Sequence, residues 1–109
     1  MMLSLKRLRD ALTSINGLDV YHYWRPRLQA PFLVWAEDGE DSALHTSNHK
    51  AEQGISGTID YYTKTEYDTM VETIQEKLNT VENLGWRLNS VQFEDETNLI
   101  HYEWTFSIA

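Results

Sequence analysis

The chain has 109 residues, 41% of them hydrophobic, with four Trp, six Tyr and no Cys. This length predicts one domain with a single core, and the lack of Cys excludes disulfides, thiolate zinc ligands and a cysteine nucleophile. The net charge of −8 argues against nucleic-acid binding, and because no apolar run approaches the roughly 18 residues of a membrane span, we expect a soluble, intracellular protein.

The N-terminal segment has apolar residues at steps of three and four, with charged residues between them. Leu5, Leu8, Leu12 and Ile15 carry this pattern, which predicts an amphipathic helix over residues 3–15. Gly17 is suited to end it, because glycine adopts the left-handed conformation at little steric cost.

Two strands are predicted next. Val20–Trp24 is β-branched and aromatic, and Pro26 stops it because proline cannot donate to a strand ladder. Phe32–Glu37, which follows Pro31, is apolar on both alternating faces. That pattern indicates a central strand.

A polar loop is predicted at residues 38–54. Long loops of this kind often carry function, and this one contains His45 and His49 among acidic residues. The spacing matches neither a calcium-binding loop nor the helical zinc-protease motif. We therefore expect no metal or cofactor, and interpret the loop as a partner contact.

A third strand and a second helix follow the loop. Gly54–Tyr62 alternates with period two, and Gly57 within it indicates a bulge or a close backbone approach. Thr65 is the predicted N-cap of the second helix, with Asp68 reaching back. Apolar residues from Tyr67 to Val81 predict the buried face of this helix. Gly85 is the residue predicted to end it.

The C-terminal residues predict an antiparallel hairpin. Alternate residues from Ile100 to Ile108 are apolar, the pattern of a strand with one buried face. In the preceding strand the apolar parity changes between Leu88 and Val91, so we expect a bulge near Asn89–Ser90. The elements predict an α+β domain, with two helices on one face of a mainly antiparallel sheet of about five strands, in the order α-β-β-β-α-β-β.

The charges are unevenly distributed along the chain. Residues up to Arg27 include five basic and two acidic side chains, whereas the remainder has four basic and fifteen acidic ones. Opposite charges on different sides of one subunit favour head-to-tail contacts between copies. The candidate assembly surface consists of Lys6, Arg7, Arg9, Asp38, Glu40, Asp41, His45 and His49.

Residues 57–68 (GTIDYYTKTEYD) and 88–104 (LNSVQFEDETNLIHYEW) resemble the small tail-terminator, or tail-completion, proteins of long-tailed phages and prophages of Gram-positive bacteria. The similarity extends over the whole chain and rests on structural motifs. It implies a hexameric ring that caps the tail tube, stops its growth and presents a surface to the head connector. It also implies assembly in the host cytoplasm, a place at the tail–head junction of the virion, and no catalytic residue.

Two alternatives stay open. One is a head-closure or neck adaptor protein, which also forms a ring but acts on the connector side. The other is a small ligand-binding protein or enzyme that uses His45, His49 and the acids of the polar loop. The chain shows no nucleophile–base pair and no phosphate-binding glycine loop, which favours a structural protein over an enzyme.

Overall fold

Two helices and five strands follow one another in the predicted order. The structure is a computed structural model that describes residues 2–24, 29–41 and 54–109. Its elements, in chain order, are α1 (Met2–Thr13), β1 (Val20–His22), β2 (Phe32–Asp41), β3 (Gly54–Thr63), α2 (Met70–Leu78), β4 (Leu84–Glu94) and β5 (Leu99–Ile108).

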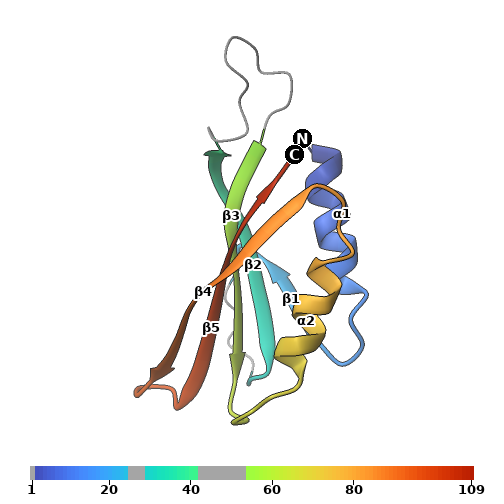
Figure 1. Cartoon of the computed structure of the whole chain (residues 1–109). Coiled ribbons are helices and arrows are strands. Elements are labelled where there is room, and N and C mark those ends of the chain that lie inside the picture. The colour runs from blue at the N-terminus through green and yellow to red at the C-terminus, as the bar shows by residue number, and fades with distance from the viewer. Residues whose placement is uncertain (1, 25–28, 42–53) are drawn as a thin grey trace.

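The strands form one sheet in the order β1-β2-β3-β5-β4. The short β1 pairs with β2 in parallel, and all other neighbours are antiparallel. Both helices lie on the same face of this sheet (Figure 1). The predicted α+β class, with two helices on one face of a mainly antiparallel sheet, is therefore confirmed.

Large aromatic side chains fill the space between the helices and the sheet. Trp35, Tyr61 and Trp104 are almost completely buried there, and the Trp104 indole Nε1–H donates to Gln75 Oε1 of α2 at 3.1 Å. Aliphatic side chains of both helices complete this core, among them Leu8, Leu12, Ile74 and Leu78. The sequence has few aliphatic residues, so the aromatics supply much of the buried apolar area.

The C-terminal hairpin has the predicted alternation. Trp104, Phe106 and Ile108 are buried, while the residues between them are only partly buried. The pairing of β4 with β5 shifts between Leu88 and Ser90, which confirms the predicted bulge. The close approach expected at Gly57 is also present, because a Cβ atom there would lie 2.7 Å from the Phe106 ring.

The second helix begins later than predicted. Tyr67 has a positive φ of 57°, and a right-handed helix cannot pass through that conformation. The N-cap is Thr69 rather than Thr65, while Asp68 accepts hydrogen bonds from Tyr61, Thr63 and the Met70 N–H. The predicted Thr65–Asp68 capping pair is wrong, and Tyr67, expected in the buried face, is 88% exposed.

The end of α2 and the bounds of the polar loop also need correction. The helix ends at Leu78, so Gly85 does not terminate it and lies in β4 instead. Residues 38–41 continue β2, and Gly54 is the first residue of β3. Residues 39–41, predicted as loop, pair with β3, with Asp41 opposite Gly54, while Asp38 lies where the register shifts between Glu37 and Gly39. Residues 42–53 lie outside the described part of the chain.

Candidate assembly surfaces

The predicted basic residues are exposed on α1. Lys6, Arg7 and Arg9 all lie on its solvent side, and Arg9 pairs with the neighbouring Asp10 at 2.9 Å. Lys6 and Arg9 line a cavity together with His22 of β1 and Glu37 of β2. The helix therefore brings positive charge to the side of the sheet that ends in β1.

The predicted acidic residues do not join this basic surface. Asp38 accepts a hydrogen bond from Ser56 Oγ at 3.4 Å, on the sheet face opposite the helices, and Glu40 is exposed further along β2. The Asp41 backbone ends β2. Its side chain, and both His45 and His49, lie outside the described residues, so their role in assembly or in ligand binding stays a prediction.

An aromatic and polar cluster occupies the β1 edge. The His22 ring stacks between Tyr23 and Trp35, with centroid distances of 3.9 Å on both sides. Glu37 accepts hydrogen bonds from Tyr23 Oη at 2.5 Å and from His22 Nε2 at 2.7 Å. Burial alone would raise the pKa of Glu37, but these bonds outweigh it and lower the pKa. Beside this cluster, Trp24 is 78% exposed.

The opposite edge of the sheet carries a row of exposed apolar side chains. We call Leu88, Val91 and Phe93 the hairpin stripe; they are 39%, 51% and 59% exposed. They pair with Trp104, Tyr102 and Ile100 of β5, respectively. Directly opposite residues share a sheet face, so the stripe lies on the helix side, where the hairpin extends away from both helices (Figure 1).

The hairpin stripe is exposed because the hairpin is longer than the helix that covers it. The 11 residues of β4 span about 36 Å at roughly 3.3 Å per residue. The 9 residues of α2 span about 13 Å at roughly 1.5 Å per residue. The pattern of apolar residues predicts that Val91 and Phe93 lie in a strand, but only the different lengths of β4 and α2 indicate that they lie beyond the helix.

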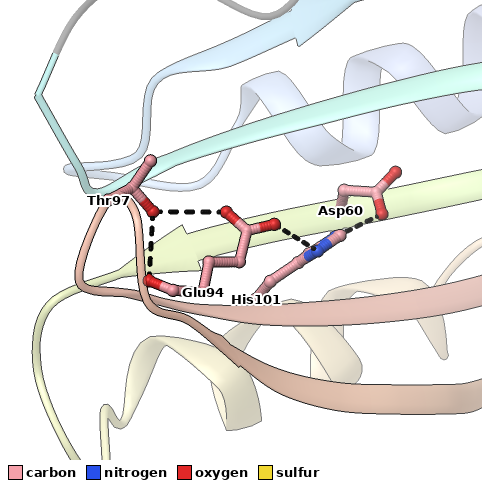
Figure 2. Close-up of polar contacts among 4 residues, drawn as sticks. All are labelled: Asp60, Glu94, Thr97 and His101. Atoms are coloured by element: carbon pink, nitrogen blue, oxygen red, sulfur yellow. Dashed lines mark hydrogen bonds and ion pairs between the residues drawn. The ribbon is translucent and has the colours of Figure 1, made fainter.

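A polar cluster on the opposite sheet face joins three strands (Figure 2). His101 Nε2–H of β5 donates to Asp60 Oδ1 of β3 at 2.6 Å, and its Nδ1 lies 3.4 Å from Glu94 Oε2 of β4. Thr97 Oγ1 donates to Glu94 Oε1 at 3.3 Å. Carboxylates only accept hydrogen bonds, so an imidazolium with both N–H groups satisfies this arrangement.

The cluster is suited to holding the strands together. A histidine that is protonated on both nitrogens has no free lone pair with which to act as a general base. Thr97 contacts the Glu94 carboxylate rather than His101, so the imidazole is not placed to activate the threonine hydroxyl. The hydrogen bond to Asp60 raises the pKa of His101, against the opposite effect of burial, and the charges of Asp60, Glu94 and Glu103 add to the increase.

This raised pKa predicts a pH-dependent contribution to stability. The folded state binds the proton more tightly, so the contribution is complete below about 6.5, the usual imidazole pKa, and disappears as pH rises through the higher pKa of the folded state. Urea unfolding of the wild type and His101→Gln should therefore give a difference in unfolding free energy that is larger in acid than in alkali. Gln92→Ala, an exposed change on β4, serves as the control. A pH-independent difference for His101→Gln would contradict the assignment.

Comparison with known proteins finds no family model that matches the chain and no curated protein with significant similarity to it. Among the described residues, no group of three or more histidine, cysteine, aspartate or glutamate side chains is arranged to hold a metal ion. No helix within the described ranges is long and apolar enough to cross a membrane.

Proposed function

We propose that this protein is a phage tail terminator, a structural subunit that forms a ring on the end of the tail tube, stops its growth and provides the head-joining surface. The resemblance of residues 57–68 and 88–104 suggests this role. One structural observation gives this proposal its main support. Opposite edges of a single sheet both have exposed apolar side chains, Trp24 beside β1 and the hairpin stripe on β4.

The charges at these edges support contacts between copies. The β1 edge lies beside the exposed cations of α1, whereas the tip of the β4–β5 hairpin carries Asp95 and Glu96, directly after Glu94. Two different, complementary surfaces on one subunit produce head-to-tail association, which closes into a ring when the rotation between copies permits it. A hexamer is the ring size that the resemblance implies.

Addition of the purified protein to polymerising cognate tail tube protein tests the proposal. We expect shorter tubes that carry a ring at one end in negative-stain electron micrographs, because a capped end cannot accept further tube subunits. Tubes assembled without the protein provide the reference length. Unchanged tube growth with no bound ring would contradict the proposal. Binding to the head connector in place of the tube would instead support the head-closure alternative.

A further inference from the structure

A small cavity opens between α1 and the β1 side of the sheet. Its volume is about 140 Å³, and apolar side chains of Met2, Leu5 and Trp35 form much of its lining. A cavity of about 150 Å³ with apolar walls holds a benzene molecule, so this one is of a size to receive a phenyl ring. Lys6 and Arg9 also line it, and both are exposed. Glu37 lines the cavity too, but His22 and Tyr23 donate hydrogen bonds to it, and Arg9 pairs with Asp10 at its edge. The cavity therefore has apolar walls, and Lys6 and Arg9 are the cations beside it.

The other edge of the sheet has a side chain that fits this cavity. Phe93 is the most exposed member of the hairpin stripe, at 59%, and it comes immediately before the acidic tip of the hairpin. Asp95 and Glu96 in that tip are both exposed. An exposed phenyl ring followed by two acids is suited to a cavity with apolar walls that has the Lys6 and Arg9 cations beside it.

We propose that Phe93 of one copy inserts into the α1–β1 cavity of a second copy, with Asp95 and Glu96 facing Lys6 and Arg9. This inference rests on the proposed function, because it assigns the contact that would join the copies in the ring. The occupant is another copy because β1 and β4 lie at opposite ends of the strand order. The contact is accordingly heterologous, and each copy uses its cavity and its hairpin with different neighbours.

Charge reversal tests the contact in the full-length chain. One variant, Lys6→Glu with Arg9→Glu, has an acidic cavity and an acidic tip; the other, Asp95→Lys with Glu96→Lys, has a basic cavity and a basic tip. Each should associate roughly tenfold more weakly than the wild type, since like charges meet at every contact. An equimolar mixture should recover wild-type association, because every alternating contact then joins opposite charges. Sedimentation velocity, with and without tail tubes, measures this association.

A second pair of variants tests the apolar part of the contact. Phe93→Ser should also weaken association by roughly tenfold, because interfaces depend on a few buried aromatic anchors, while Gln92→Ser, on the other face of the same strand, should not. Phe93 is 59% exposed in the isolated subunit, so we expect Phe93→Ser to keep the fold of that subunit.

The outcomes separate this contact from the proposed function. If the wild type associates and these variants associate equally well, or if the mixture does not recover association, the Phe93 contact is overturned. The proposal that the protein forms a ring would still stand. A wild type that fails to associate, alone or on tail tubes, would overturn both proposals.

Discussion

Trp104→Ala should lower the free energy of unfolding by about 3–5 kcal/mol, the range for removing a large aromatic side chain from a core. Trp104 is completely buried, at the centre of β5 and beneath α2. Its loss leaves a cavity between the sheet and the helix and removes the indole hydrogen bond to Gln75. Denaturant unfolding followed by far-ultraviolet circular dichroism measures the change.

Trp24→Ala is the matched control for this experiment. The same chemical change at a side chain that is 78% exposed should alter the unfolding free energy by no more than about 0.5 kcal/mol. A loss below about 1 kcal/mol for Trp104→Ala would mean that the helix side of β5 is not the packed core.

Gly57→Ala should destabilise the protein about as much as Trp104→Ala. We expect the free energy of unfolding to fall by about 3 kcal/mol or more, because the substitution forces an atom into a packed site. The added Cβ would lie 2.7 Å from two atoms of the Phe106 ring and closer still to the Ala36 carbonyl oxygen. That oxygen belongs to the backbone of β2, so it cannot move aside without disturbing the pairing of β2 with β3. Thermal and denaturant unfolding should both report the loss.

Gly85→Ala provides the comparison, because the nearest atom to a Cβ at that position is the Ser107 carbonyl oxygen at 4.0 Å. There the substitution should leave stability unchanged or increase it by up to about 1 kcal/mol, since alanine restricts the unfolded chain. Equal effects of the two substitutions would show that β2, β3 and β5 do not approach one another as closely as described.

Local patterns predicted much of the fold. The alternation from Ile100 to Ile108 set the buried face of β5, and the change of parity between Leu88 and Val91 located the bulge in β4. Gly57 within a strand pattern indicated a close approach of another part of the chain, which the structure shows to be the Phe106 ring and the Ala36 backbone. Each of these signals depends on residues adjacent in sequence, which is why it can be interpreted without the tertiary structure.

Errors arose where contacts distant in sequence determine the conformation. Asp68 accepts hydrogen bonds from Tyr61 and Thr63 of β3, so a side chain that resembled part of a helix cap ties the loop to the sheet. Likewise, β2 extends to Asp41 because it pairs with β3, although its last residues have low strand propensity. Tertiary pairing outweighs local preference at both positions.

The candidate surfaces were predicted only in part. Clustering of charge near the N-terminus indicated the basic side of α1, but the predicted acidic partners were sought in the polar loop. The structure draws attention instead to the hairpin tip, with Asp95 and Glu96 beside Phe93. The strand order places the β4–β5 hairpin and β1 at opposite ends of the sheet, and sequence alone did not provide that order.

Native mass spectrometry of the purified protein, alone and bound to tail tubes, tests the central claim most directly. If copies join head to tail through the two edges of the sheet, the spectra should contain a closed ring of one fixed number of subunits, at least on the tubes. A strictly monomeric protein under both conditions, or an open series of oligomers of every size, would contradict the account.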